Sequence, residues 1–501
     1  MRAHLLSPAH DFAVDAPEPP FSDDLAADLQ LDYLWDAMAG GDAFLRAVAR
    51  AGLLHPVRDL GEIRYRQEAL ADCAAGRDAV RELYDLAVEA VELPRHGFLM
   101  LRAHGRPELV LARALRLLAG LADLLDRFRR RCAELTPLFS SRAFRGLFAT
   151  IAHELDDEQM RLIRQRIAEL SFRRGLLMSA GVGVRGEVTH QVLRLPKEEN
   201  RGLFDRTPMR RPRYSFTLAP RDEAGFAALG ELRDRSINDV ADAAAQSADH
   251  VLSFFGALRA ELGFFLASLN LADALGALGA PMCTPDPSAE ESTRASGLYD
   301  PCLALRMGRA PVGNDVAMGR SGLLVVTGAN RGGKSTLLRA LGTAQLMVQA
   351  GMLAPATRFD ARPVGAVFSH WAREEDGGLQ HGKLDEELDR MGRIVRTIRS
   401  GDLLLCNESF ASTNEAEGSQ ILWEVTCALR DAGVQVRSVT HLYEFAHAVA
   451  ADAGLDAVFL RAPRAEDGRR SFRLEPGGPL RTSYGLDLYD QTFGTDLAAQ
   501  G

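Results

Sequence analysis

The sequence predicts an α + α/β fold, in which a helical N-terminal half precedes a domain built on a mixed, mainly parallel sheet. Between about residues 29 and 170, and again between 222 and 275, apolar residues recur at three- and four-residue steps. That spacing is typical of amphipathic helices. After about residue 290, short apolar runs alternate with helical patterns, which is the order in which strands and crossover helices build a parallel sheet.

Length and composition narrow the class of protein. A chain of 501 residues, 47% hydrophobic and 25% charged, predicts a globular protein of about two to four domains. No apolar run approaches the ~20 residues that span a bilayer, and we find no signal peptide, so we expect a cytoplasmic protein with no membrane partner. The six cysteines form no Cys-x-x-Cys pair, which argues against a zinc site and a disulfide framework. The net charge of −9 leaves a nucleic-acid partner open, because local patches decide such binding.

The N-terminal half divides into a flexible arm, residues 1–22, and a helical domain, residues 23–290. The arm is predicted from its content of Pro, Asp and Ala. Within the domain, an apolar stripe runs from Leu111 to Phe128, and four arginines lie at its C-terminal end: Arg127, Arg129, Arg130 and Arg131. These arginines either contact phosphate or form a solvated face that complements the helix C-terminus, and the second interpretation is the commoner one.

A short β and basic insertion interrupts the helical domain at about residues 176–218. Residues 182–193 alternate and contain glycine, as hairpins do. The loop that follows combines basic residues with Phe204 and Tyr214, a composition that suits nucleic acid. The candidate DNA contacts are Lys197, Arg201, Arg206, Arg210, Arg211 and Arg213. Acidic residues in the same loop make an ordinary solvent-facing insertion an equal alternative. A proline-rich break at 281–293 then marks the boundary of the second domain, residues 291–501.

A glycine-rich stretch, Thr327–Thr336, links an apolar strand at 323–326 to a helical pattern that begins at Leu337. Strand, Gly-x-x-x-x-Gly-Lys-Ser and helix in this order predict a phosphate-binding loop. Glycine lets the backbone amides wrap around phosphates, lysine reaches the β- and γ-phosphates, and the serine hydroxyl can ligate Mg²⁺. The candidate nucleotide-binding residues are Gly328, Asn330, Gly332, Gly333, Lys334, Ser335 and Thr336. A chance glycine-rich turn is the alternative, and the register of Lys334 and Ser335 argues against it.

Two further strands end in polar residues that complete the predicted site. The strand at 403–406 is followed by Asn407 and Glu408, where P-loop ATPases carry one carboxylate near Mg²⁺ and a second that orients the attacking water. Glu408 is therefore a candidate catalytic residue, and Asn407 a candidate metal contact through water, together with Ser335. The strand at 434–439 leads to His441, a candidate donor that senses the γ-phosphate.

These motifs together resemble the MutS family of DNA mismatch-repair ATPases, within the ABC class. The stretch TGANRGGKST is similar to the family's TGPNMGGKST, and residues 299–301, 312–315 and 351–356 resemble its elements on either side. Asn407-Glu408 with Ser412, Thr413 and Gly418 is similar to the family's DExGxGTS, residues 440–444 to its THYHE, and residues 476–477 and 483–486 to its closing motif. Residues 63–70 resemble the family's helical core more loosely.

The resemblance implies a helical core and lever domain, and an ABC-type P-loop ATPase domain that binds ATP and Mg²⁺ and works as a homodimer on DNA. It further implies that ATP binding and hydrolysis close the dimer on duplex or branched DNA, in repair or recombination, with repair proteins as further partners. Gly382 aligns with the serine that reaches the partner's nucleotide, and Lys383 beside it is a cationic substitute. Both are candidate residues for a site completed across the dimer.

Departures from the family pattern shape three functional hypotheses. The chain has no Phe-x-Glu element of the kind that wedges beside a mismatch, Pro311 stands where the family stacks an aromatic on adenine, and Asn407 replaces the usual aspartate. We therefore expect a slow DNA-dependent ATPase that does not read mismatches directly. The alternatives are a mismatch-repair protein that binds mismatched DNA, and a nucleotide-gated scaffold with weak hydrolysis and protein partners.

Overall fold

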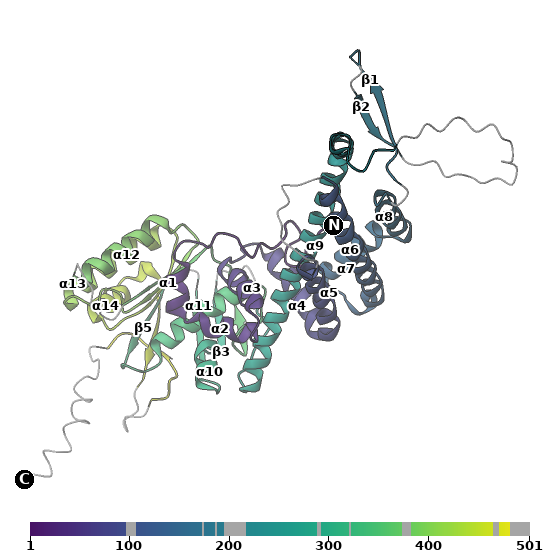
Figure 1. Ribbon diagram of the computed structural model, residues 1–501. Coiled ribbons are helices and arrows are strands. Elements are labelled where there is room, and N and C mark those ends of the chain that lie inside the picture. Colours follow the sequence, from purple (N-terminus) through teal and green to yellow (C-terminus); the bar gives the residue numbers. More distant parts are fainter. Residues whose placement is uncertain are drawn as a thin grey trace, which may run out of the picture. The chain divides into compact units, whose positions relative to one another are not determined.

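The computed structural model describes residues 1–96, 107–172, 175–185, 188–194, 217–287, 292–319, 322–372, 382–463 and 470–480 (Figure 1). Two compact units are present. The first contains residues Met1–Ala3, Arg81–Phe139 and Phe144–Arg259, and the second contains His4–Val80, Ser140–Ala143 and Ala260–Gly501. A helical part and a mainly parallel sheet are both found, so the predicted α + α/β class is confirmed.

The second unit is built on a six-stranded sheet with the strand order β11-β10-β5-β9-β8-β7. Its strands are β5 (Leu324–Gly328), β7 (Val367–Trp371), β8 (Leu403–Asn407), β9 (Gln435–Val439), β10 (Val458–Ala462) and β11 (Glu475–Pro476). All neighbouring strands are parallel except β10 and β11. β5, β7 and β8 are almost wholly buried, which explains why they are continuous apolar runs rather than alternating ones.

Helices cover both faces of this sheet. On one face, apolar residues of β5, β8 and β9 form a core with α12 (Lys383–Thr397), α13 (Glu415–Asp431) and α14 (Tyr443–Ala451). On the other face lies α11 (Lys334–Gln349), whose Gly342 is so close to Leu405 that a Cβ there would lie 2.6 Å from Leu405 Cδ1. The same Cβ would meet Leu29 of α1 at 3.0 Å. Helix α11 is therefore packed between the sheet and a further helical layer.

That further layer comes from the N-terminal residues, so the units do not follow the predicted boundary near residue 290. The helices concerned are α1 (Ser22–Leu29), α2 (Leu31–Ala39), α3 (Ala43–Leu54) and α4 (Leu60–Ala75). α1 contacts α11 and β7, α3 contacts α11, and α2 contacts α10 (Pro301–Met307). Trp35 and Leu29 are fully buried. Long-range apolar packing of α11, rather than sequence proximity, thus groups residues 4–80 with the second unit.

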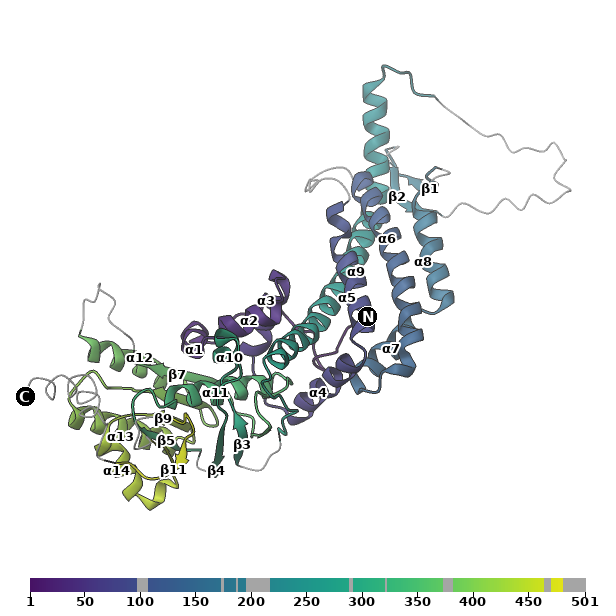
Figure 2. The same ribbon diagram turned by 90° about the horizontal axis from the view of Figure 1, so that it is seen from below.

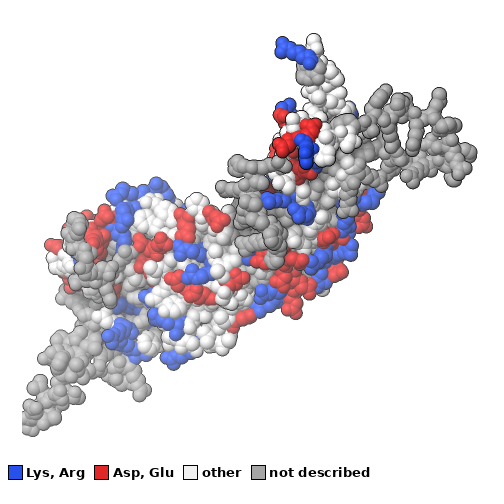
Figure 3. Space-filling view, in the orientation of Figure 1, with Lys and Arg blue, Asp and Glu red and all other residues white. Residues whose placement is uncertain are grey.

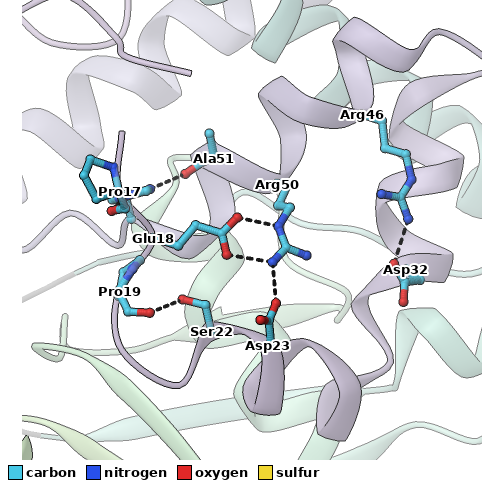
Figure 4. Close-up of polar contacts among 10 residues, drawn as sticks. Pro17, Glu18, Pro19, Ser22, Asp23, Asp32, Arg46, Arg50 and Ala51 are labelled. Carbon is cyan, nitrogen blue, oxygen red and sulfur yellow. Dashed lines mark hydrogen bonds and ion pairs between the residues drawn. The ribbon is translucent and has the colours of Figure 1, made fainter. Parts of the chain in front are cut away.

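Parts of residues 1–22, which we expected to form a flexible arm, lie against the protein. Leu5 and Leu6 are buried. Further along, Glu18 receives two hydrogen bonds of 2.6 Å from the Arg50 guanidinium, which also contacts Asp23 at 2.8 Å (Figure 4). The prediction relied on a Pro- and Asp-rich composition, which indicates only local stiffness and polarity. The contacts that hold this segment join residues far apart in the chain, so composition does not predict them.

A small antiparallel sheet completes the second unit. Its strands are β3 (Thr293–Leu298), β4 (Asn314–Met318) and β6 (Arg358–Asp360), in the order β4-β3-β6. Helix α10 begins directly after β3, with Asp300 as its N-cap accepting the Leu303 amide at 3.1 Å. This sheet positions Asn314 at the start of β4, next to the candidate site.

The first unit is mainly helical. It contains most of α5 (Arg77–His96), all of α6 (Pro107–Leu135), η1 (Thr136–Leu138) and α8 (Asp157–Leu170), α7 (Arg142–Glu154) from Phe144 onward, and much of α9 (Glu223–Ala277). Helices α5 to α9 are labelled in Figure 2. Its core joins α6 to α9 through Leu111, Leu115 and Ile237. The antiparallel hairpin of β1 (Met178–Val182) and β2 (Val188–Leu193) agrees with the β character predicted there. Among the described residues, α9 alone is long and apolar enough to cross a membrane, but 67% of its apolar window is buried, as in a core helix.

The arginines at the end of α6 are engaged with acidic neighbours, which favours the solvated-face interpretation. Arg127 contacts Glu89, Arg131 contacts Glu82 and Glu134, and both Arg129 and Arg130 contact Asp126. On the face shown in Figure 3, acidic and basic side chains are interspersed rather than gathered into a patch of one sign. The exposed pairs among these, such as Arg127 with Glu89, contribute little stability, about 0–1 kcal/mol each, whereas Asp126 is buried.

Candidate functional site

The glycine-rich loop lies between β5 and α11, at the carboxyl edge of the parallel sheet. Gly328 and Gly333 adopt φ values of 106° and 93°, in the left-handed region that favours glycine. A Cβ on Gly328 would lie 2.6 Å from the Ala462 carbonyl oxygen of β10, and one on Gly332 would lie 2.8 Å from the Ala329 carbonyl oxygen. The loop backbone is therefore packed too closely for side chains at these positions, so its amides can approach a ligand.

Lys334 is the first residue of α11 and is 5% exposed. Its ammonium donates to the carbonyl oxygens of Gly328 at 2.8 Å and Ala329 at 3.4 Å, both within the loop. It also lies 3.9 Å from the Glu408 carboxylate. Burial lowers the pKa of Lys334, and the charge of Glu408 opposes that shift. The ammonium is thus held by carbonyl oxygens at the loop and close to a carboxylate on the neighbouring strand end.

Ser335 and Asn407 contact each other directly. The Ser335 hydroxyl donates to the Asn407 side-chain carbonyl at 2.7 Å. Asn407 is the last residue of β8, and Glu408 follows it with a left-handed φ of 54°. That conformation is uncommon for a residue with a side chain and costs of order 1–3 kcal/mol. The Glu408 amide donates to Val439 of β9 at 2.8 Å, which helps to hold the turn.

Glu408 and His441 form a pair across the ends of β8 and β9. His441 Nδ1 lies 2.7 Å from a Glu408 carboxylate oxygen, and the His441 backbone amide donates to the same oxygen at 3.1 Å. This hydrogen bond raises the pKa of His441, against the opposing effect of burial. The protonated imidazolium is therefore favoured beside Glu408.

Buried side chains of α12 and β7 hold the turn at Glu408 through hydrogen bonds to the residues that follow it. Phe410, two residues on, has a φ of 60° and donates its amide to the Glu387 carboxylate of α12 at 2.6 Å. Burial raises the pKa of Glu387. Beside it, His370 Nδ1 lies 2.7 Å from the Ser409 hydroxyl. The strained backbone at Glu408 is thus tied to α12 and β7 through side chains that are themselves buried.

A cavity of about 480 Å³ opens over the loop, within the size range of small-molecule sites. Its lining is Leu303, Met307, Arg309, Ala310, Pro311, Val312, Asn314, Asn330, Arg331, Gly332, Gly333, Lys334, Ser335, Thr336, Glu408 and Phe472. Phe472 is 48% exposed, and Asn314 fixes its segment by donating to the Phe472 carbonyl at 3.1 Å and accepting the Leu474 amide at 2.7 Å. Sequence reasoning missed Phe472, Arg309 and Arg331, and the nearest signal was the Asn314 motif.

The structure brings the candidate residues of the nucleotide site together and places Gly382 and Lys383 apart from them. The loop residues, Asn407, Glu408 and His441 converge at one edge of the sheet. Gly382 and Lys383 lie exposed at the start of α12 and do not line the cavity. The candidate DNA contacts, Lys197, Arg201, Arg206, Arg210, Arg211 and Arg213, lie outside the described residues.

The donor groups suit a polyphosphate better than a metal ion. Backbone amides of a loop at a helix N-terminus, with a lysine at the helix start, attract phosphate. For Mg²⁺ the chain offers a hydroxyl and a neutral amide, and the two are hydrogen-bonded to each other, whereas Mg²⁺ is usually held by carboxylates and phosphates. In the described part of the chain, no three His, Cys, Asp or Glu side chains cluster as metal ligands would.

Comparison with known proteins agrees with the order of motifs along the chain. A family model described as the MutS2 N-terminal domain matches residues 58–278, and one described as MutS domain V matches residues 324–492. The DNA mismatch repair protein MutS of Chlorobium phaeobacteroides is 27% identical over 168 residues, 33% of this chain and 19% of that protein. The endonuclease MutS2 of Lacticaseibacillus casei is 30% identical over 167 residues, 31% of this chain and 21% of that protein. The chain thus matches about a fifth of the length of these relatives. With both family models matched in the expected order, the chain belongs to the MutS family.

Proposed function

We propose that this protein is an ABC-type ATPase that binds ATP over the Gly328–Thr336 loop, hydrolyses it slowly and couples nucleotide state to DNA binding in repair or recombination. The observation that carries the proposal is the convergence of Lys334, Ser335 and Glu408 at one edge of the sheet. A nucleotide is the expected ligand because the cavity continues from the loop to Phe472, on whose exposed ring a base can stack.

Each group has a defined part in the proposed reaction. The loop amides and the N-terminus of α11 bind the phosphates, and the Lys334 ammonium exchanges its loop carbonyls for phosphate oxygens. Glu408 accepts a hydrogen bond from the attacking water and orients it. His441, held by Glu408 at 2.7 Å, donates to the terminal phosphate.

Slow turnover follows from the metal donors of this chain. Bound Mg²⁺ would neutralise phosphate charge, but Asn407 brings no charge to that position and already accepts the Ser335 hydroxyl. We therefore expect lower hydrolysis than in relatives that carry an aspartate there. The same feature favours the second candidate function, a nucleotide-gated scaffold that bridges protein partners and hydrolyses ATP poorly.

The DNA part of the proposal rests on family membership. The named relatives are a DNA mismatch repair protein and an endonuclease. We propose that a nucleotide-bound homodimer closes around duplex or branched DNA, with Gly382 and Lys383 facing the partner's nucleotide from the exposed start of α12.

Substitution of the two central residues tests the ATPase assignment. Lys334→Ala should abolish binding of a fluorescent ATP analogue, and Glu408→Gln should keep binding while phosphate release falls to background. Glu424→Gln is the matched control, because Glu424 is exposed on α13 and does not line the cavity. Normal hydrolysis by Lys334→Ala would refute the assignment.

A binding panel tests the DNA assignment and separates the hypotheses. Homoduplex, mismatched duplex, four-way junction and single strand are compared at low salt, where phosphate contacts are strongest, with and without ATP. Preference for junctions, with ATPase stimulation, supports the proposal, and selective stimulation by a mismatch supports direct mismatch repair. If the protein bound none of the four DNAs, the DNA assignment would be wrong and the result would support the nucleotide-gated scaffold.

A further inference from the structure

The cavity carries more positive charge than a single phosphate-binding lysine provides. Its lining includes three cationic side chains, Arg309, Arg331 and Lys334, against one carboxylate, Glu408. Neither Arg309 nor Arg331 has an ion-pair partner among the described residues. Burial is the largest cause of the lowered pKa of Lys334, and the positive charge of Arg470 lowers it further. Arg470 therefore adds to the positive potential around Lys334.

Arg331 has a placement that suits contact with phosphate. It is the central residue of the loop, at the position where the related motif has methionine, and its backbone is left-handed with a φ of 59°. Its side chain is exposed and lines the cavity next to the residues at the start of α11. A guanidinium is a planar donor that pairs with phosphate oxygens in a bidentate fashion and stays protonated at neutral pH.

Where a metal ion is usually held, this site has less negative charge than the related motif, because Asn407 stands in place of an aspartate. A carboxylate at position 407 would hold a metal-bound water and repel a phosphate that carries no metal. Asn407 does neither, and its side-chain carbonyl is occupied by the Ser335 hydroxyl at 2.7 Å. Glu408, the carboxylate among the described residues that line the cavity, is engaged by His441 at 2.7 Å and faces Lys334 at 3.9 Å. Negative charge has thus been removed where a metal is usually held, and positive charge is present on the loop.

We infer that this site binds nucleotide without Mg²⁺, with Arg331 supplying the phosphate-neutralising charge that the metal supplies elsewhere. The inference rests on the proposed nucleotide-binding function and specifies the form of the ligand. A metal-free nucleoside diphosphate or triphosphate carries more negative charge than its magnesium complex, so a cavity with surplus cations favours it. Nucleotide binding is then independent of the metal, whereas hydrolysis requires it.

The experiment is calorimetric titration of the full chain with ADP, which avoids turnover, in excess Mg²⁺ and again in excess EDTA. For the wild-type protein we expect the dissociation constant in EDTA to lie within tenfold of that in Mg²⁺. Asn407→Asp should increase the ratio of the two constants at least tenfold, because the added carboxylate repels the metal-free phosphates. Arg331→Met should weaken binding in EDTA at least tenfold and weaken it less in Mg²⁺.

A control variant and a folding check show whether a change in ADP affinity comes from the substituted side chain. Arg396→Met removes an exposed arginine of α12 that does not line the cavity, and it should leave both constants unchanged. Circular dichroism of each variant confirms folding, and Arg331 is exposed, so its loss leaves no buried gap. A wild-type ratio of tenfold or more would overturn the inference while the proposed function stands. Absence of ADP binding under both conditions would overturn both.

Discussion

Replacement of Arg437 by methionine should stabilise the second unit. Arg437 lies in β9 between Leu324 of β5 and Leu405 of β8 and is fully buried. None of its three guanidinium nitrogens has a hydrogen-bond partner in the described part of the chain. Burial alone lowers the pKa of Arg437 from 12.5 to about 10. At 1.36 kcal/mol per pKa unit, that shift corresponds to a penalty on the order of 3 kcal/mol for keeping the charged form inside. Even a buried ion pair can be replaced by apolar residues of similar volume with a change that is often neutral or stabilising by about 1–4 kcal/mol, and the Arg437 guanidinium lacks the partner that such a pair has.

Tryptophan fluorescence during urea denaturation measures this effect selectively. The three tryptophans, Trp35, Trp371 and Trp423, all lie in the second unit, so their signal reports its unfolding. Arg437→Met should raise the urea midpoint without a change in slope. Arg396→Met, at an exposed position, should stay within about 0.5 kcal/mol of wild type. A destabilised Arg437→Met protein would refute the reasoning and would mean that the guanidinium has a stabilising partner.

Three further predictions concern the buried acids and the Glu408 pair. Glu387→Ala should destabilise the second unit by about 1–3 kcal/mol in urea, because the Phe410 amide loses its acceptor at 2.6 Å. Glu408→Gln should lower the pKa of His441 toward 6.5, measured by NMR titration, because its hydrogen bond to Glu408 raises that pKa. Burial raises the pKa of Glu261 from 4.5 to about 7, so stability should fall as the pH rises from 4.5 to 7, and Glu261→Gln should remove this fall.

The folded pKa of His441 lies above 6.5, so the stability it contributes is present below pH 6.5 and is lost as the pH rises through the folded pKa. For Glu261 the folded protein binds the proton more tightly than the unfolded chain, so raising the pH favours unfolding. Glu386→Ala is the matched control for Glu387→Ala because Glu386 is exposed. An unchanged His441 titration, a wild-type midpoint for Glu387→Ala, or a Glu261→Gln protein with the wild-type pH dependence would each contradict its prediction.

Local sequence signals predicted the central part of the second unit. β5, the glycine-rich loop and α11 are contiguous, and their residue types are dictated by strand burial, close backbone packing and the helix start. The positions of Asn407 at the end of β8 and of His441 shortly after β9 followed from the same signals, because parallel strands finish at one edge of a sheet. The proximity of Lys334, Ser335 and Glu408 was therefore foreseeable from order and spacing alone.

Long-range contacts account for what the sequence did not predict. Phe472 reaches the cavity through Asn314, 158 positions earlier in the chain, and no local pattern links the two. The grouping of residues 4–80 with the second unit depends on side chains such as Leu29 meeting α11 at Gly342. The left-handed backbone of Glu408 depends on Val439 and Glu387, which lie on other elements. Each of these features is set by tertiary packing, which residue composition and periodicity do not predict.

The helical layer over α11 has a practical consequence for anyone who dissects this protein. A fragment cut at residue 291 would retain the phosphate loop but lose α1 to α3, and the apolar surface of α11 that meets Leu29 would face water. Such a fragment should aggregate or lose affinity for nucleotide, however complete its motifs are. Soluble pieces of the second unit should require residues 4–80 to be supplied, either fused to the C-terminal half or co-expressed with it.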